Sequence, residues 1–170
     1  MSSTPTEHKR EAPSFVNASI VTVSDTRTRE NDKSGKRIVE LLKNAGHTVN
    51  DHIILRDEAI LLQQQLEEML ADKRVDVILI TGGTGIAARD ITIETVSSLF
   101  DKELPGFGEI FRMLSYTEDI GSSAIMSRAA AGTAGRTALF AIPGSIGAVT
   151  LAMEKLILPE LQHIKQQLNK

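Results

Sequence analysis

The stretch VILITGGTGIAARD, residues 77–90, decides the fold class that the sequence predicts. Its first four residues are apolar and run directly into the glycine-rich segment 81–85, which is typical of a buried strand that ends in a loop. Glycine has no Cβ and readily adopts positive φ, so such a loop can bring backbone N–H groups close to an oxyanion. The stretch therefore predicts a strand and an anion-binding loop, closed by the charged pair Arg89 and Asp90.

Strand and helix patterns alternate along the rest of the chain. Runs rich in β-branched or apolar residues predict strands at residues 18–23, 48–55, 75–80 and 137–142. Apolar residues at helical spacing predict helices at residues 34–45, 58–73, 92–100, 109–116 and 146–168. The alternation predicts a single α/β domain, built as a three-layer αβα sandwich with a mostly parallel sheet.

Three places in this pattern need comment. Residues 104–108, LPGFG, should interrupt the helical pattern before residue 109. Residues 121–135 fit a helix and a strand equally well. Pro159 should kink or restart the last helix, because the apolar stripe continues beyond it.

Polar residues follow each predicted strand. Ser24 and Asp25 follow the first strand, Asp57 follows the second, the glycine loop follows the third, and the segment Pro143-Gly144-Ser145 follows the fourth. In parallel sheets, ligands bind beyond the carboxyl ends of the strands, near the point where the strand order changes direction. We therefore expect these segments to meet in one crevice, although they lie far apart in the sequence.

The overall composition excludes several classes of protein. A length of 170 residues fits one domain, since domains usually have about 100–200 residues. The net charge of −3, the low aromatic content of 4% and the absence of Trp argue against binding to nucleic acid. The absence of Cys excludes thiol nucleophiles, iron–sulfur clusters and disulfides, and the 4 His residues lack the spacing of zinc ligands.

The N-terminus and the apolar runs predict a cytoplasmic protein without a membrane anchor. Residues 1–14 lack the apolar core of a signal peptide and predict a disordered tail, so the folded domain should comprise residues 15–170. No apolar run approaches the roughly 20 residues that a membrane span needs.

Two nucleotide-binding motifs share features with the glycine loop. A P-loop needs a lysine directly after its last glycine, and no lysine follows Gly85. The spacing of Gly83, Gly85 and Ala88 fits the dinucleotide-binding fingerprint, but that fingerprint belongs after the first strand of a domain. A nicotinamide-dependent oxidoreductase is therefore only an outside alternative.

Asp57 and Asp90 are the main candidates for catalysis, because each stands at a strand end of the predicted crevice. Two carboxylates can hold Mg²⁺ against a triphosphate, or one can accept a proton while the other orients a substrate. Each could instead cap a following helix, where Asp is common, and Thr92 is another candidate cap. Ser24 and Ser145 could donate to a phosphate or a pterin, or serve as ordinary turn and cap residues.

Five blocks of the sequence together resemble the molybdenum cofactor biosynthesis MoaB/Mog family. They run in the family's order from about residue 19 to about residue 152, and the later blocks are closer to the MoaB branch. A GGTG segment alone would be unspecific, whereas five ordered blocks are specific. The blocks are VTVSDTR (21–27), TGGTG followed by ARD (81–90), GFGEIFRMLSY (106–116), SSAIMSRAAAGTA (122–134) and LFAIPGSIGAV (139–149).

The resemblance implies a trimer or hexamer that binds molybdopterin. Active family members transfer AMP from Mg-ATP to the terminal phosphate of molybdopterin, release pyrophosphate and leave an adenylylated pterin ready for metal insertion. The main alternative is a non-catalytic carrier, which binds molybdopterin and passes it to other molybdenum cofactor biosynthesis proteins. Both would keep the same glycine loop.

The resemblance also implies roles for individual residues. The family's two functionally important aspartates correspond to Asp57 and Asp90, which would place Mg²⁺ and ATP. Arg89 would clamp a phosphate or pair with a neighbouring carboxylate, and many relatives carry a proline where this chain has Ala87 and Ala88. The residues expected to bind molybdopterin or its phosphate are Ser24, Thr81, Gly82, Gly83, Thr84, Gly85, Arg89, Pro143, Gly144 and Ser145. Accessory residues, which would reach the crevice or an adjoining subunit, are Asp25, Glu109 and Arg112.

Overall fold

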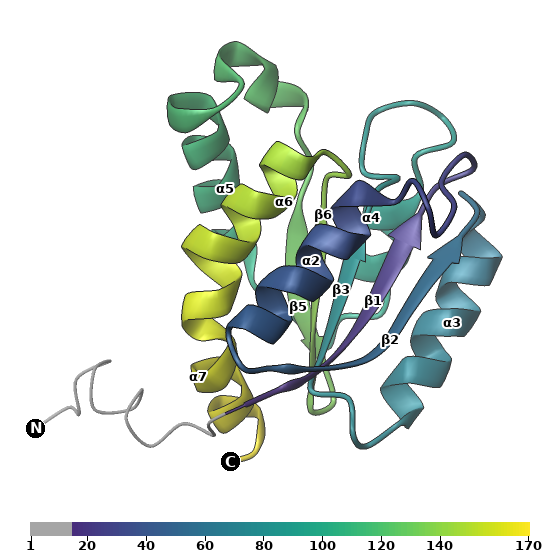
Figure 1. The fold of residues 1–170 in the computed structure, drawn as a ribbon, viewed down its shortest axis with the longest axis vertical. Coiled ribbons are helices and arrows are strands. Elements are labelled where there is room, and N and C mark those ends of the chain that lie inside the picture. Colours follow the sequence, from purple (N-terminus) through teal and green to yellow (C-terminus); the bar gives the residue numbers. More distant parts are fainter. Residues whose placement is uncertain (1–14) are drawn as a thin grey trace, which may run out of the picture.

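Six strands form one sheet in the computed structural model, which describes residues 15–170 (Figure 1). Their order is β2-β1-β3-β6-β5-β4. The first four strands in this order pair in parallel, and β5 and β4 continue the sheet in antiparallel pairing. The strands are β1 (Asn17–Val23), β2 (Thr48–Leu55), β3 (Val77–Thr81), β4 (Lys102–Glu103), β5 (Ala130–Ala134) and β6 (Thr137–Ile142). The predicted tail, residues 1–14, lies outside the described residues.

Helices cover both faces of the sheet, which confirms the predicted three layers (Figure 1). One face carries α2 (Lys33–Asn44), α5 (Pro105–Glu118), α6 (Ile146–Ala152) and α7 (Leu158–Leu168), and the other carries α3 (Ala59–Ala71) and α4 (Thr92–Ser97). Along β3, Val77 and Leu79 belong to the first core and Ile78 and Ile80 to the second. Burial on both faces explains why this strand is apolar throughout.

The start of α5 corrects one prediction. The segment LPGFG was expected to break the helical pattern, but α5 begins at Pro105, where the fixed φ suits a first helical turn and the missing N–H has no partner to lose. Gly108 lies within this helix, and a Cβ on it would be 2.7 Å from the carbonyl oxygen of Ala129. The helix can therefore pack closely against the chain that enters β5.

The ambiguous segment 121–135 contains both kinds of structure. A 3₁₀ helix, η1 (Gly121–Met126), is followed by β5, whose pairing with β6 is antiparallel. The predicted helix 92–100 is shorter, because the chain turns after Ser97 and pairs with β5. The prediction for Pro159 is confirmed: a π-helical segment, η2 (Met153–Ile157), joins α6 to α7, and Pro159 lies in the first turn of α7. No helix within residues 15–170 is apolar over a length that would cross a membrane.

The buried carboxylate of Asp32 joins the start of α2 to two strands. Its Oδ1 accepts from the Gly35 N–H at 2.9 Å and from Ser34 Oγ at 3.2 Å. Its Oδ2 accepts from Thr22 Oγ1 at 2.6 Å and lies 3.0 Å from His52 Nε2. Burial raises the pKa of Asp32, but the hydrogen bonds from Thr22 and Gly35 and the nearby His52 outweigh it, so the pKa lies below its ordinary value.

We predict that Asp32→Asn lowers the free energy of unfolding at pH 7 by about 1–3 kcal/mol, because a buried charged acceptor loses part of its bonding. A folded-state pKa below the unfolded value stabilises the protein above that unfolded value, near 3.9, and the effect disappears as the pH falls. Urea denaturation at several pH values should therefore show the difference between wild type and variant shrinking below about pH 4. A difference that is constant with pH would contradict this role, and Asp51→Asn is the control, because Asp51 is an exposed aspartate of β2.

Candidate functional site

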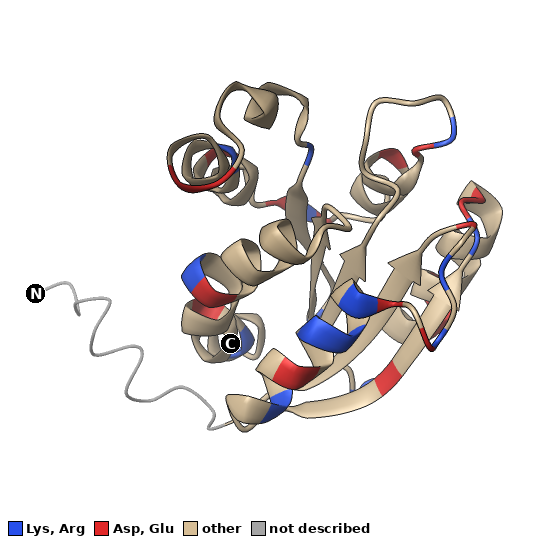
Figure 2. Ribbon diagram, turned by 45° about the horizontal axis from the view of Figure 1, so that its top comes forward, with Lys and Arg blue, Asp and Glu red and all other residues tan. Residues whose placement is uncertain are grey.

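A cleft of about 530 Å³ lies at the carboxyl ends of the parallel strands. It confirms the expectation that the segments after β1, β2, β3 and β6 meet, because all four contribute to its lining. Figure 2 shows basic and acidic residues together on the loops around this edge of the sheet. The predicted residues that line the cleft are Ser24, Asp57, Thr81, Gly82, Gly83, Thr84, Gly85, Arg89, Asp90, Pro143, Gly144 and Ser145.

Two consecutive glycines set the path of the loop after β3. Gly82 has φ 92° and Gly83 has φ 63°, a region that L side chains rarely adopt. A Cβ on Gly82 would overlap the carbonyl oxygen of Val23, and a Cβ on Gly83 would overlap Thr92 Oγ1 and lie 2.8 Å from Asp57 Oδ1. Both positions therefore require glycine for two reasons, the backbone conformation and the lack of space.

The loop presents a series of backbone donors that the protein does not use. The Gly82 N–H donates to the carbonyl of Ile142 at 3.1 Å, which ties the start of the loop to β6. Within residues 15–170, the next four N–H groups, those of residues 83–86, donate no hydrogen bond. Consecutive free N–H groups in a turn are a common anion-binding arrangement. The loop therefore has the unused backbone donors that an anion-binding loop needs.

Thr92, the first residue of α4, holds the other side of the loop. Its N–H donates to the carbonyl of Gly83 at 2.9 Å, and its Oγ1 donates to the carbonyl of Gly82 at 2.8 Å. Thr92 is thus not the helix cap that the sequence predicts, since the cap position is Ile91. These two bonds occupy the carbonyls of Gly82 and Gly83.

Asp57 connects the ends of β1 and β2 and carries a perturbed carboxyl group. Its Oδ2 accepts from the Asp25 N–H at 3.0 Å, and the Asp25 Oδ1 accepts in return from the Asp57 N–H at 3.1 Å. Burial raises the pKa of Asp57, and the negative charges of Asp25 and Asp90 add to the rise, whereas the Asp25 N–H and the Arg89 cation oppose it. A site with this excess of negative charge favours a cation.

The structure excludes one of the roles that the sequence left open for Asp57 and Asp90, that of a helix cap. Neither Asp57 nor Asp90 is a helix cap, because the cap positions are Glu58 and Ile91. The Asp90 Oδ2 instead accepts from the Ala87 N–H at 2.8 Å and so closes the loop on itself.

Ser145 is a helix cap as well as a cleft residue. Its Oγ accepts from the Ala148 N–H at 3.1 Å at the start of α6. Ser24 likewise acts as a turn residue, because its Oγ accepts from the N–H groups of Thr26 and Arg27, each at 3.2 Å.

The expected accessory residues do not line the cleft of this chain. Asp25 reaches it only through its pairing with Asp57. Glu109 and Arg112 lie on α5, and Arg112 lines a separate hollow with Met113. The alternative that Arg89 pairs with a carboxylate is wrong within residues 15–170, where its guanidinium has no ion pair.

Several cleft residues were not predicted to be site residues. Arg27 follows the Ser24 turn and donates to the carbonyl of Asn31 at 3.0 Å. Arg128 comes from the ambiguous segment and reaches the glycine loop. Arg128 belongs to one of the five sequence blocks that resemble the family, but nothing in the local sequence pattern indicates that its side chain contacts residues 84 and 85. The other cleft residues missed from the sequence are Thr22, Val23, Thr26, Ser34, Met126 and Ser127.

The side chains of the cleft can hold a metal ion only when a bound phosphate compound supplies further oxygen atoms to the ion. Within residues 15–170 there is no cluster of three or more His, Cys, Asp or Glu side chains placed to bind a metal. Asp57 and Asp90 nevertheless lie close enough for the charge of one to raise the pKa of the other. Mg²⁺ typically takes one or two carboxylates and completes its shell with phosphate oxygens and water. The two residues fit that pattern.

Known proteins are similar to this chain over nearly its whole length. Molybdenum cofactor biosynthesis protein B of Bacillus subtilis (strain 168) is 57% identical over 164 residues, which cover 96% of each chain. A crystal structure of a molybdenum cofactor biosynthesis protein B matches with a TM-score of 0.90 and 57% identity, covering 94% of this chain and 99% of that one. The tungsten cofactor synthesizing protein MoaB from Pyrococcus furiosus matches with a TM-score of 0.84 and 38% identity, covering 94% and 100%.

A family model described as "Probable molybdopterin binding domain" matches residues 19–163. The fold is thus that of the class of α/β domains that this model describes. Within this class, the chain belongs to the molybdenum cofactor biosynthesis protein B family, and its role lies in the biosynthesis of that cofactor.

We predict that Gly83→Ala destabilises the protein more than Gly46→Ala. Gly46 has a similar φ of 82°, but a Cβ there meets nothing within 4 Å, so only the backbone cost of about 1–2 kcal/mol applies. At Gly83 the contacts with Thr92 and Asp57 add to that cost and displace the loop. Chemical denaturation and a molybdopterin titration should show the larger loss of stability, and at least about tenfold weaker binding, only for Gly83→Ala. Equal effects of the two substitutions would contradict the fitted loop.

Proposed function

We propose that the protein binds molybdopterin in this cleft and transfers AMP from Mg-ATP to the terminal phosphate of molybdopterin, releasing pyrophosphate. One observation carries the proposal: four consecutive unused N–H groups, residues 83–86, lie beside the carboxylates of Asp57 and Asp90. The first feature suits a phosphate, and the second suits the cation that accompanies a nucleoside triphosphate. Membership of the molybdopterin-binding family supports the identity of the acceptor.

The loop would hold the terminal phosphate of molybdopterin by its backbone. Free N–H groups bind an anion without the conformational cost of ordering long side chains, because the loop is already fixed by Gly82 and Thr92. Arg27 and Arg89 also line the cleft, and the guanidinium of Arg89 has no ion pair within residues 15–170. Arg89 can therefore neutralise phosphate charge without first breaking another ion pair.

Asp57 and Asp90 would place Mg²⁺ against the phosphates of ATP. The ion, when bound, neutralises charge on the phosphates that leave as pyrophosphate. The raised pKa of Asp57 supports this role, because a bound cation would relieve the repulsion among Asp25, Asp57 and Asp90. Both carboxylates must be ionised to bind the ion, so the activity should fall as the pH drops through the raised pKa of Asp57.

The transfer itself needs no nucleophile from the protein. An oxygen of the terminal molybdopterin phosphate attacks the α-phosphorus of ATP, a new P–O–P bond forms, and the bond between the α- and β-phosphates breaks. A phosphate monoester is largely a dianion at neutral pH, so no general base is required. The contribution of the protein is alignment of the two phosphates and neutralisation of their charge.

The oxidoreductase alternative has no support in the fold. The glycine loop follows β3, whereas the dinucleotide-binding fingerprint follows the first strand of its domain. Between the loop and β4 there is only the six-residue helix α4, and β4 itself has two residues. The chain therefore lacks, at the required place, the second strand whose end would carry the ribose-binding acid.

We also propose that the protein forms a trimer or hexamer through α5 and η1. These elements expose large apolar residues, including Tyr116 with 62% and Ile125 with 87% of the residue surface exposed. Met113 and Ile110 on the same helix are also exposed. An apolar surface of this kind is typical of an interface between subunits.

Purified protein, incubated with molybdopterin and Mg-ATP, should form pyrophosphate and adenylylated molybdopterin in equal amounts. Molybdopterin binding without either product would contradict the enzyme and favour the carrier. Asp90→Asn should lower the rate of AMP transfer by about 100-fold or more, because a charge that acts on the transition state is lost. The variant should still bind molybdopterin, since its amide oxygen can accept from the Ala87 N–H. Unchanged turnover would show that Asp90 only shapes the loop.

Asp101→Asn is the matched control for this substitution. Asp101 also accepts a backbone N–H, that of Gly135, but it lies outside the cleft. Its replacement should leave the rate of transfer unchanged.

Sedimentation should give a mass of three or six times that of the chain, which is 18.5 kDa. Ile125→Asp should shift the protein towards the monomer, because it buries a charge in the proposed interface. Ile60→Asp is the control, since Ile60 is 72% exposed but lies on α3, away from α5 and η1. A wild-type protein that sediments as a monomer would contradict the proposal.

A further inference from the structure

Arg128 is a cleft residue to which the proposed reaction assigns no role. It follows η1 and precedes β5, and its side chain crosses to the glycine loop. The Nε atom donates to the carbonyl of Thr84 at 3.0 Å and to the carbonyl of Gly85 at 3.1 Å. The Nη2 atom donates to the carbonyl of Gly85 at 2.7 Å. One guanidinium therefore holds two consecutive carbonyl groups of the loop.

The same guanidinium is held in turn by Glu94, which lies in the first turn of α4. The Nη1 atom of Arg128 donates to Glu94 Oε1, and Nη2 lies 3.3 Å from Glu94 Oε2. The hydrogen bond from Arg128 lowers the pKa of Glu94, so this carboxylate is ionised at neutral pH. Arg128 is thus fixed between the loop and the helix that follows the loop, through bonds that only a planar guanidinium can make together.

Holding these carbonyls also determines where the adjacent N–H groups point. In a planar trans peptide, the C=O and the N–H of the same peptide unit point in opposite directions. The carbonyl of Thr84 faces Arg128, so the N–H of Gly85 points away from the guanidinium. The carbonyl of Gly85 likewise directs the N–H of Ile86 away. Both N–H groups belong to the four unused donors of the loop.

We infer that Arg128 is a positioning residue that orients the N–H groups of Gly85 and Ile86 for the anionic end of the ligand. Without it, either peptide unit could rotate and present a carbonyl oxygen, which would repel a phosphate. The ion pair with Glu94 neutralises the charge of Arg128, so this guanidinium acts through the loop, whereas the guanidinium of Arg89 has no ion pair within residues 15–170. The identity of the ligand in this inference rests on the proposed function. The orientation of the loop does not, because it follows from the bonds of Arg128 to the loop carbonyls.

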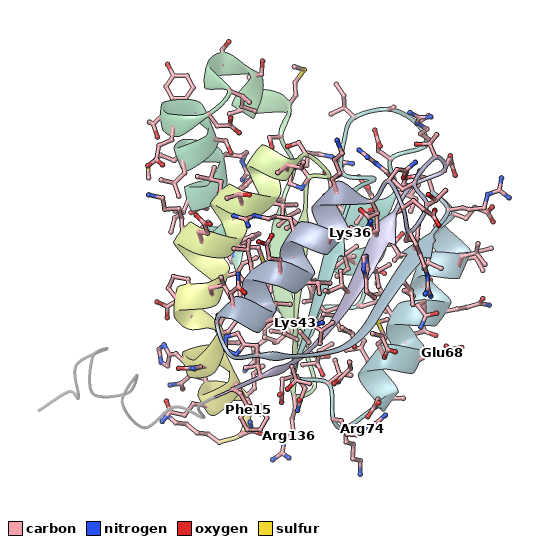
Figure 3. The ribbon with its side chains drawn as sticks, viewed as in Figure 1. Phe15, Lys36, Lys43, Glu68, Arg74 and Arg136 are labelled. Carbon is pink, nitrogen blue, oxygen red and sulfur yellow. The ribbon has the colours of Figure 1, made fainter. Side chains whose placement is uncertain are left out.

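The test compares Arg128→Lys with Arg74→Lys. Arg74 also pairs with a carboxylate, that of Asp72, and lies at the end of the molecule opposite the cleft (Figure 3). A lysine keeps the charge at position 128 but cannot donate to both carbonyls and to Glu94 together. We expect Arg128→Lys to weaken molybdopterin binding at least about tenfold, as the loss of hydrogen bonds from a charged donor implies, and Arg74→Lys to have no effect.

A measurement without any ligand separates this inference from the proposed function. Amide order parameters from nuclear magnetic resonance should fall for Gly85 and Ile86 in Arg128→Lys, from the range of a rigid backbone near 0.85 towards that of a flexible loop below about 0.6. The order parameter of Gly135, far from the loop, should stay unchanged. If the order parameters of residues 85 and 86 do not change, the inference is wrong, whatever the binding data show.

The binding experiment has a separate outcome for the proposed function. A wild-type protein that does not bind molybdopterin would overturn that function, while the order parameters would still decide the role of Arg128. Wild-type affinity in Arg128→Lys would overturn the positioning role and leave the proposed function standing. A larger effect of Glu94→Gln than of Arg128→Lys would also overturn it, because Glu94 acts on the loop only through Arg128.

Discussion

The close contact of the glycine loop with β1 and α4 is the constraint on which the rest of the site depends. Gly82 lies against the carbonyl of Val23, and Gly83 lies between Thr92 and Asp57, so neither position has room for a Cβ. The positive φ angles that these contacts impose turn the chain so that its next N–H groups find no partner within residues 15–170. The parallel strands supply the rigid frame, because β3 is buried on both faces and its end cannot shift.

The surroundings of this loop are arranged for a ligand and not for the stability of the free protein. A carboxyl with a raised pKa costs stability at neutral pH when no ligand is present, and the unused N–H groups of the loop remain available to a ligand. Groups of this kind concentrate at functional sites, where a ligand satisfies them. The neighbouring bonds made by Thr92, Asp90 and Arg128 compensate by fixing the carbonyls and the turn of the loop. The cleft is therefore preorganised, which lowers the entropic cost of binding.

The sequence predicted the part of the structure that local pattern determines. The strands ending near Val23 and Thr81 were predictable, because burial in a parallel sheet requires short apolar runs. Parallel strands also place their carboxyl ends together, including that of the edge strand β2 at Leu55. The placement of Asp57 and Asp90 in one cleft followed from that geometry. Their chemical roles came from the family resemblance and still await the activity measurements.

The sequence could not predict what depends on long-range packing. Residues 121–135 have no single period, because they form a 3₁₀ helix and then an antiparallel strand, and Arg128 lies at the junction. Its contact with Gly85 spans 43 residues and exists only because β5 pairs with β6 beside the loop. Similarly, a Pro-Gly segment usually marks a break, but Pro105 lies in the first turn of α5, where its fixed φ suits the helix. Gly108 then lets this helix pack closely on Ala129, a contact that the local sequence does not indicate.

The interaction on which the proposed function depends is the binding of the ligand phosphate by backbone N–H groups of the glycine loop. It is tested most directly by following backbone amide resonances during a titration with molybdopterin. We expect the largest downfield shifts of amide protons at residues 83–86, because their N–H groups form hydrogen bonds to phosphate. If these resonances stay unchanged while others move, for example around the hollow lined by Lys73 and Arg136 at the opposite end of the sheet, the loop does not bind the phosphate.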